Sequence, residues 1–449
     1  MNSVLSSNAN SALSMTLMNS ESKVNPQEYS LNKIYPFHSQ QLVSIPPLNS
    51  SSTYSQGTTL NYDLNKYGIA KGIVLHLKAT FTQGHTAHAT NNLPNFHTLQ
   101  TAMINAIDEV ELLSSSRSIS KMDRASILAS FRDMPADVRQ SFTEAIEANA
   151  QPTPTAIVGS REMFLPLVFP IFASASTFPN LTFQEPMRLV VRLSNAPISA
   201  DRNAHADVNG SMVASNVSFS KADVIVSYIN YDAKTEDELL NENYGDASGQ
   251  LSLLTYEYES ENPDVKDYDA NQTLEVELKQ TSVVSDIYFY VCVPASDLTG
   301  TYTANYYNLG EVPLELDNVK LVASGQTILD VPAKYLKLWG CPSDENFFGA
   351  GVVGETAGID KSGIDRVYKI QFGQSISKAF ASNGISLREL NNVKLTCSVK
   401  QNGTAGGGAV QLKDGTAAKG KLELRVINRS HSIITIDANN GRVQKNINN

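Results

Sequence analysis

One strand-and-turn pattern occurs twice in this 449-residue chain, and it constrains the fold more than any other feature. The first copy is Asp108–Ile119 and the second is Asp317–Ile328, displaced by 209 positions (317 − 108) and aligned without a gap. Both read Asp-x-Val-x-Leu-apolar-small-Ser-x-x-hydroxyl-Ile, so each alternates apolar and polar residues with the period of a half-buried strand. Small residues that suit a tight turn come after each strand. The shared positions are Asp108, Val110, Leu112, Ser115 and Ile119 in the first copy, and Asp317, Val319, Leu321, Ser324 and Ile328 in the second.

Short alternating runs are common in strands, so the two copies alone would leave a chance likeness open. The order of the later segments favours a duplication over a chance likeness. Three segments after the first copy have counterparts after the second copy, at offsets of 204, 206 and 198 positions (368 − 164, 393 − 187 and 422 − 224). The segments are Phe164–Ile171, Met187–Ser194 and Val224–Asn230 after the first copy, and Tyr368–Ile376, Val393–Val399 and Leu422–Asn428 after the second. We interpret this as one all-β domain used twice. In both copies the valine and leucine of the pattern are predicted to point into the core.

The chain divides into five predicted parts: an arm at 1–30, a first domain at 31–231, a linker at 232–250, a second domain at 251–437 and a tail at 438–449. Most of each domain reads as strands and long polar loops, which favours antiparallel sandwiches over α/β units. Apolar residues at helical spacing predict two short helices within 121–149, joined through Met134-Pro135. Arg161–Phe172 is predicted as one strand, and Lys421–Ile427 and Ile433–Ile436 as two closing strands. The glycine-rich segment 340–365 takes the place of the helices in the second domain.

Composition narrows the class of protein. Hydrophobic residues make up 41% and charged residues 18%, which suits a globular core and excludes global disorder. A net charge of −10 argues against a surface that wraps nucleic acid. The three cysteines show neither a disulfide framework nor metal-ligand spacing. Residues 1–22 lack Lys, Arg and a long apolar run, so no export signal is expected.

Several stretches resemble sequence motifs of cofactor-binding or metal-binding sites. Gly349–Gly354 matches a dinucleotide fingerprint, but no helix pattern comes after it to meet a pyrophosphate. Asp267–Asn271 resembles the start of a calcium loop without its glycine or closing glutamate. His85, His88 and His97 lie in a polar loop with no Cys, Asp or Glu nearby to complete a zinc site. We therefore predict no catalytic, cofactor or metal residues, and no enzyme.

These features together resemble a known family. A tandem pair of eight-stranded antiparallel jelly-roll sandwiches, with short helices inserted in a loop of the first, is similar to the double jelly-roll major capsid proteins. That lineage includes the adenovirus hexon, the tectivirus coat, and the capsid proteins of large algal DNA viruses, virophages and Polinton-like viruses. The likeness covers roughly residues 31–437. The stretches that carry it are Ala106–Ile119, Met163–Phe172 with Pro186–Ser194, and Gly363–Gln374 with Asn391–Val399.

The resemblance implies a major capsid protein of the virion, made in the cytoplasm or nucleus of a host cell. It implies homotrimers, in which six sandwiches form a pseudo-hexameric tile of an icosahedral shell. Neighbouring capsomers are the implied partners; penton and minor capsid proteins and an internal membrane are further options, and no specific nucleic acid is expected. The apolar residues Val4, Leu5, Leu13, Leu17 and Met18 make 1–30 a candidate assembly arm. The alternative is a host-attachment or carbohydrate-binding protein, favoured by the loop tyrosines Tyr302, Tyr306 and Tyr307.

Overall fold

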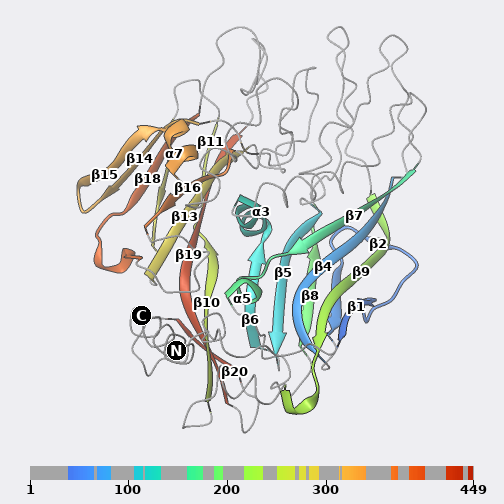
Figure 1. The fold of residues 1–449 in the computed structure, drawn as a ribbon. Helices are drawn as coiled ribbons and strands as arrows, with labels where there is room; N and C mark the ends of the chain where they lie inside the picture. The colour runs from blue at the N-terminus through green and yellow to red at the C-terminus, as the bar shows by residue number, and fades with distance from the viewer. Residues whose placement is uncertain are drawn as a thin grey trace, which may run out of the picture.

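The computed structural model describes residues 39–64, 68–81, 106–114, 117–132, 159–174, 187–195, 217–235, 250–267, 273–279, 283–292, 313, 316–339, 366–372, 384–399, 421–437 and 443–447. Strands dominate these ranges, and they form four antiparallel sheets with a few short helices (Figure 1). Two sheets belong to the first half of the chain and two to the second, as the duplicated pattern predicts.

The first domain pairs the sheet β1-β9-β4-β7 with the sheet β3-β8-β5-β6, and the short β2 lies beside β9. Its strands are β1 (Ser39–Ile45), β2 (Tyr54–Ser55), β3 (Thr59–Asp63), β4 (Ile69–Phe81), β5 (Ile107–Ser114), β6 (Arg117–Asp123), β7 (Gly159–Leu167), β8 (Arg188–Leu193) and β9 (Val217–Asn230). Alternate side chains of these strands are fully buried between the sheets, for example Leu189 and Val191 on β8. Tyr62 on β3 also ties the two sheets together, because its hydroxyl donates to the Ala222 carbonyl on β9 at 2.8 Å.

The second domain pairs the sheet β10-β19-β13-β16 with the sheet β12-β18-β14-β15. Its strands are β10 (Gln250–Ser260), β11 (Asp264–Asp267), β12 (Thr273–Glu277), β13 (Val283–Cys292), β14 (Leu316–Ala323), β15 (Gln326–Pro332), β16 (Tyr368–Gln371), β17 (Ile385–Ser386), β18 (Lys394–Val399), β19 (Lys421–Asp437) and β20 (Val443–Ile447). The short strands β11 and β20 pair with β19, and β17 pairs with β13. A buried tyrosine again bridges the sheets: the Tyr368 hydroxyl accepts a hydrogen bond from the Leu316 amide at 3.1 Å.

Both domains order their strands in the same way. Leaving aside β2, β11, β17 and β20, each domain has eight main strands. In each, one sheet takes the first, eighth, third and sixth of these strands in chain order, and the other takes the second, seventh, fourth and fifth. This is the strand order of a jelly roll. It confirms the predicted pair of eight-stranded antiparallel jelly-roll sandwiches.

The repeated pattern is reproduced element by element. The strands β5 and β14 have the same burial pattern, with every second residue enclosed, and both continue into a hairpin partner. In each hairpin one residue bulges out of register, Ile119 in β6 and Ile328 in β15, and these two isoleucines are 209 positions apart. A bulge of this kind adds local twist to an edge strand. The offset holds for the next element too, since α3 (Arg124–Arg132) and α7 (Ala333–Trp339) begin 209 positions apart.

Three expectations about secondary structure are wrong. The second domain also carries a helix, α7, which ends just before the glycine-rich segment 340–365, and that segment lies outside the described residues. Only Ala333 and Leu336 of α7 are buried among its residues of described burial, so the helix leaves a weak periodic signal in the sequence. The helix predicted around Val138, Phe142 and Ile146 lies outside the described residues.

The predicted strand Arg161–Phe172 is in fact strand β7 followed by the helix α5 (Pro170–Ser174). Proline is favoured at the first position of a helix, because its fixed φ suits the turn and its missing N–H would have no helical acceptor. The two predicted closing strands are one strand, β19, because the polar residues between them pair with β10. The predicted tail 438–449 contains β20, which pairs with Ser432–Ile436 of β19.

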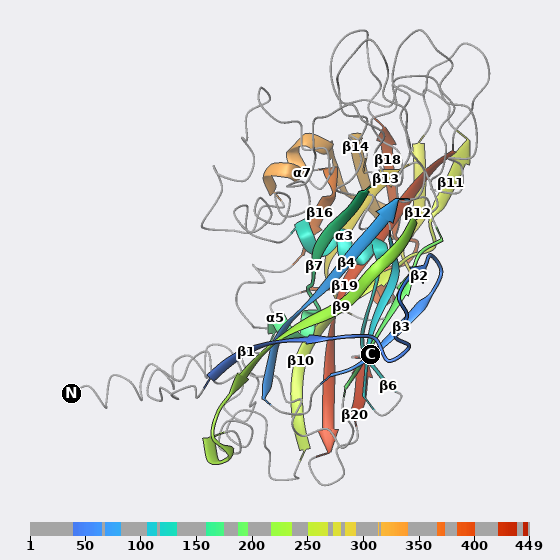
Figure 2. The ribbon, with the colours of Figure 1, turned by 90° about the vertical axis from the view of Figure 1, so that its right-hand side faces the viewer.

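The four sheets are stacked along one direction of the molecule. In Figure 1 the sheet containing β14 and β15 lies at the left, the sheet of β13 and β19 comes next, and α3 and α5 lie beyond it. The sheet of β5 and β8 and then that of β4 and β9 complete the stack at the right. Figure 2 looks onto this last sheet, whose outer face has no other described element in front of it. The two domains are therefore arranged head to tail.

The hydrophobic core also continues from one domain into the other. The second sandwich has its own core, which includes Leu274, Phe289, Leu321 and Leu395. The core of the first sandwich runs across the boundary into the second domain, where it takes in Tyr288, Tyr290, Cys292, Val367, Ile427, Ile434 and Ile436. The β10-β19-β13-β16 sheet is thus packed on both faces, and the two domains bury side chains against each other as a single body.

Candidate functional site

The helix α3 is the centre of the junction between the domains. All nine of its residues are buried, although they include Arg124 and Arg132. It begins directly after β6 because Asp123 caps it: the Oδ1 atom accepts hydrogen bonds from the Ser126 amide at 2.8 Å and the Ser126 hydroxyl at 2.6 Å. The other carboxylate oxygen, Oδ2, accepts from the hydroxyl of Ser260 on β10 at 2.6 Å. One carboxylate therefore starts the helix and joins the two domains.

Arginines hold α3 at both ends. Arg124 donates to the Ile107 carbonyl at 3.1 Å, to Asp108 at 3.1 Å and to the Ser194 hydroxyl at 2.7 Å. It locks the helix onto the first sandwich. At the other end Arg132 donates from Nε to the Val367 carbonyl of the second domain at 3.2 Å. A cation in the last turn also stabilises the helix through its macrodipole.

A buried ion cluster lies on the face of the second domain's sheet that turns toward the first domain. Asp286 on β13 is fully buried and accepts hydrogen bonds from Arg429 Nε at 3.0 Å and Arg429 Nη2. It also accepts from the Ser285 hydroxyl at 2.7 Å, and it pairs with Lys369 Nζ at 3.3 Å. Removing a charge of this kind from water is costly unless each ion is well paired. One carboxylate here binds two cations.

Aromatic rings complete that cluster. The Arg429 guanidinium lies 5.2 Å from the ring centre of Tyr256 and 5.6 Å from that of Tyr288. The Lys369 ammonium lies 5.3 Å from the Tyr288 ring centre. The negative faces of aromatic rings attract cations, so the tyrosines help to stabilise the two buried cations. The arrangement fixes the position of β13, β16 and β19 at the junction.

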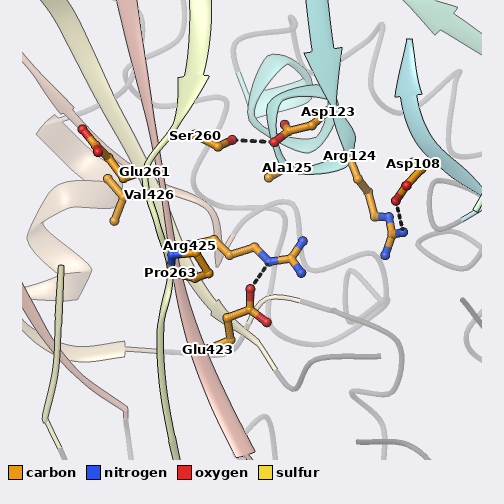
Figure 3. Close-up of a pocket in the computed structure, with 10 residues that line it drawn as sticks. All are labelled: Asp108, Asp123, Arg124, Ala125, Ser260, Glu261, Pro263, Glu423, Arg425 and Val426. Atoms are coloured by element: carbon orange, nitrogen blue, oxygen red, sulfur yellow. Dashed lines mark hydrogen bonds and ion pairs between the residues drawn. The ribbon is translucent and has the colours of Figure 1, made fainter. Parts of the chain in front are cut away.

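A pocket of about 300 Å³ opens between β5, α3, β10 and β19 (Figure 3). It is lined by Asp108, Asp123, Arg124, Ala125, Ser260, Glu261, Pro263, Glu423, Arg425 and Val426. Its charged groups have nearby partners: Arg124 pairs with Asp108, and Arg425 donates to Glu423 at 2.9 Å. Glu261 accepts from the side-chain amide of Asn428, outside the lining, at 2.7 Å. The lining contains no histidine or cysteine. Its one hydroxyl, that of Ser260, donates to the carboxylate of Asp123, which also caps α3. Each of the two ion pairs stays within one domain, and the hydrogen bond from Ser260 to Asp123 joins the two sides of the pocket.

The residues of the repeated pattern do not gather into one site. Val110, Leu112, Val319 and Leu321 are buried in the cores of the two sandwiches. Asp108 borders the pocket beside Arg124, whereas Asp317 is exposed on β14. Ser324 forms the hairpin turn, with a φ of 51°, and its hydroxyl accepts from the Asn391 amide at 3.1 Å. Ile119 is buried, but its counterpart Ile328 is exposed. Ser115 lies outside the described residues.

Other candidates from the sequence also lie outside them: the histidines 85, 88 and 97, the glycine-rich 349–354, the tyrosines 302, 306 and 307, and the arm with Val4, Leu5, Leu13, Leu17 and Met18. Of the calcium-like stretch only Asp267, at the end of β11, is described. Within the described ranges, no group of three or more His, Cys, Asp or Glu side chains is placed to hold a metal ion. No helix in these ranges is long and apolar enough to cross a membrane.

Sequence reasoning missed the ion cluster. Its signal was a single charged residue inside an otherwise apolar strand: Asp286 within β13 and Lys369 between Tyr368 and Ile370. Such isolated charges in buried strands almost always have a partner, so they could have been paired with one another.

No protein-family model and no curated protein matches the chain. Solved structures of capsid proteins match nearly all of it. VP54 of PBCV-1, fitted into a reconstruction of the virophage Sputnik, has a TM-score of 0.60 at 13% identity and covers 93% of this chain and 100% of VP54. The structure of the Sputnik virophage itself has a TM-score of 0.60 at 11% identity, with 92% and 89% covered. The Faustovirus major capsid protein has a TM-score of 0.52 at 10% identity, with 96% and 98% covered.

The chain has the double jelly-roll fold of these capsid proteins. The match spans both sandwiches, since over nine tenths of this chain takes part in each of the three comparisons. The junction around α3 is therefore the contact between the two jelly rolls of one double jelly-roll unit.

Proposed function

We propose that the chain is a viral major capsid protein, which forms homotrimeric, pseudo-hexameric capsomers that tile an icosahedral shell. The single observation that carries this proposal is that one chain holds two jelly rolls of identical strand order, fixed head to tail by a buried junction. Duplication gives one chain two similar edges, so three chains supply six similar blocks around a threefold axis. The double jelly-roll proteins matched across both domains are capsid proteins, which supports the same role here.

The mass of the purified protein in solution tests the proposal. We expect a stable species with the mass of three chains of 48.8 kDa each, and a hexagonal outline in negative-stain images. Shells in the same images would extend the result to assembly. A protein that stays monomeric at every concentration tested would contradict the proposal.

We further propose that the chain has no enzymatic activity. The described contacts of the junction pocket are structural: Arg124 pairs with Asp108, Arg425 with Glu423, and Asp123 caps α3 and holds Ser260, which supports a role in joining the domains. Turnover of any substrate by the purified protein, lost when one polar residue is changed, would overturn this. The attachment alternative rests on tyrosines outside the described residues, and no contact on the described surface favours it.

We propose that the capsomers bind neighbouring capsomers in the virion, and that residues 1–30 contribute to this step. The arm carries few apolar residues and cannot bury enough surface to fold alone, since ordering costs about 1–2 kcal/mol per residue. Deletion of residues 2–25 is expected to leave trimers that melt normally but give few shells. A normal yield of shells from the shortened chain would eliminate this role.

A further inference from the structure

The strand β1 is an edge strand that lacks the usual protection against further pairing. An edge strand presents unpaired backbone N–H and C=O groups, and natural proteins block such edges with charged residues, proline, bulges or very short strands. The seven residues of β1, Ser39–Ile45, include no charged residue and no proline, and their register with β9 is uninterrupted. Among the strands that the structure describes, only β9 pairs with β1. The other side of β1 therefore has no partner strand in the described ranges.

The remaining edge strands of four or more residues in those ranges all carry charge. Each contains at least one Lys, Arg, Asp or Glu, such as Glu275 and Glu277 on β12 and Asp330 on β15. Strand β15 is also bulged and ends on Pro332. The strands β2 and β17 lack charge, but each has only two residues. Of these described edges, β1 is the one that is long, regular and uncharged.

The apolar side chains of β1 are incompletely covered. Leu42, at the centre of the strand, is 73% exposed, more than any other large apolar side chain whose burial is described. On the opposite face Val43 and Ile45 pack against the core of the first sandwich but are only partly buried. On β7, at the other edge of the same sheet, the core-facing Met163 and Leu165 are fully enclosed. A further strand beside β1 would cover Leu42 on one face and Val43 and Ile45 on the other.

The sequence of β1 fits an antiparallel copy of itself. When a twofold axis passes beside Leu42, this residue faces its own counterpart in the second copy. The other cross-strand pairs then lie at equal distances from Leu42 along the strand: Ser39 with Ile45, Gln40 with Ser44, and Gln41 with Val43. Like charges directly opposite each other destabilise a strand pair, and none occur here. The pairing also removes two exposed leucine side chains from water.

We propose that β1 of one chain pairs antiparallel with β1 of a second copy around a twofold axis. The two β1-β9-β4-β7 sheets, each at the right-hand end of the stack in Figure 1, then join into one continuous sheet. A twofold contact uses the same surface on both copies, so it cannot build a threefold capsomer. This inference rests on the proposed capsid function in one respect: it assigns the contact to two chains of different capsomers.

The expected strength of the contact suits this place in a shell. A single edge of seven residues buries little surface, and interfaces below about 1,200 Å² are typical of weak, transient contacts. A homotrimer carries three copies of β1, so several weak contacts act together once a capsomer has neighbours on more than one side. Free capsomers would then stay apart at low concentration and associate cooperatively above it.

A charge exchange at Leu42 tests the pairing. Because Leu42 faces its own counterpart, Leu42→Lys sets like charges against each other, and so does Leu42→Glu. We expect either variant alone to raise the chain concentration at which capsomers associate by about tenfold or more, measured by light scattering. A mixture of the two variants sets opposite charges against each other and should restore association. Leu48→Lys is the matched control, because Leu48 is 56% exposed but lies outside β1, and it should associate as the unaltered chain does.

The mixture separates self-pairing from any other use of this edge. Variants that associate as well as the unaltered chain would overturn the proposal. Variants that both fail and do not recover on mixing would also overturn it, and would assign the edge to a different partner. Leu42 is exposed, so the melting temperatures of the variants should match that of the unaltered chain.

A disulfide test keeps the proposal distinct from the proposed capsomer. Directly opposed residues of antiparallel strands have Cα atoms about 4.5–5.5 Å apart, within the range of a disulfide. Oxidised Leu42→Cys is therefore expected to form covalent pairs of chains, whereas Leu48→Cys shows the background from the native cysteines. Covalent pairs from a chain that forms no trimers would refute the capsomer and support the pairing of β1. Trimers and shells without covalent pairs in Leu42→Cys would refute the pairing and leave the capsomer standing.

Discussion

At the scale of single residues, position in the sequence pattern does not decide how much a side chain stabilises the monomer. Ile119 and Ile328 occupy the same place in the two copies of the repeat, yet one is enclosed and the other is half exposed. Leu112 and Leu321 also correspond, and both are enclosed by their own sandwich core. Their surroundings, rather than their place in the repeat, set the free energy that each contributes.

Truncation to alanine should separate these cases. Leu112→Ala and Leu321→Ala are each expected to lower the free energy of unfolding by about 2–5 kcal/mol, since both leave a cavity in a packed core. Ile119→Ala should cost about as much. Ile328→Ala, measured under conditions where the chain is monomeric, should change it by less than about 0.5 kcal/mol. Denaturant unfolding gives these values, and equal losses at Ile119 and Ile328 would contradict the difference in burial.

A second residue-scale prediction concerns the buried ion cluster. Asp286→Asn leaves Arg429 and Lys369 buried with no anion between them, and breaking a buried pair in this way costs about 3–5 kcal/mol. Asp108→Asn is the matched control, because it also removes one carboxylate from an arginine, but the Asp108 side chain is 54% exposed. Its loss should cost about 1 kcal/mol or less. Thermal melting of the two variants makes the comparison, and similar melting temperatures would show that the cluster contributes little.

At the scale of elements, local sequence predicts a strand well where one face is core and the other is polar. The alternation in β5 and β14 predicted the repeat, which residues of each strand are buried, and the duplicated domain. It failed where tertiary contacts override the local pattern. The polar middle of β19, including Ser430 and Ser432, is buried by pairing with β10, and α3 buries two arginines against a second domain. Neither fact is encoded within the element itself.

The hairpin turn of the second repeat gives a prediction at this scale. Ser324 and Gly325 have φ angles of 51° and 77°, the left-handed values that a tight two-residue hairpin requires. A Cβ on Gly325 would meet no atom within 4 Å, so only backbone strain opposes a substitution. Gly325→Ala should therefore destabilise the chain by about 1–2 kcal/mol. Gly72→Ala on β4, which also meets no atom but has no such φ, is expected to be neutral or slightly stabilising. Equal unfolding free energies for the two variants would refute this account.

At the scale of the whole molecule, the chain is a head-to-tail pair of sandwiches. The duplication and the fold could be predicted from the sequence because they follow from strand patterns repeated at a fixed offset. The junction could not, since it depends on which face of the second sheet meets the first domain. It is held by contacts between residues far apart in the chain, such as Asp123 with Ser260 and Arg132 with Val367. The same reasoning explains why the sequence did not distinguish the covered repeat unit from the exposed one.

The β1-β9-β4-β7 sheet also carries a buried titratable group that should couple the stability of the chain to pH. His76 on β4 is 6% exposed and stacks on Phe164, with ring centres 4.2 Å apart. Burial, reinforced by Lys221 and Lys78 and opposed by Glu162 and Asp223, lowers the pKa of His76 from its usual 6.5. A histidine with a lowered pKa stabilises the folded chain fully above pH 6.5 and loses that contribution as the pH falls through 6.5 toward the lowered value.

We therefore expect the melting temperature to fall as the pH is lowered from 7.5 to 5.5, about one unit on either side of the ordinary histidine pKa. His76→Gln removes the titration and keeps a polar side chain of similar length, so its melting temperature should change less over the same interval. The comparison between the two proteins cancels the titration of the surrounding carboxylates, because Glu162 and Asp223 are present in both. Differential scanning calorimetry at a fixed chain concentration measures both melting temperatures. If the unaltered chain and His76→Gln lose stability in parallel, the pH dependence does not come from His76.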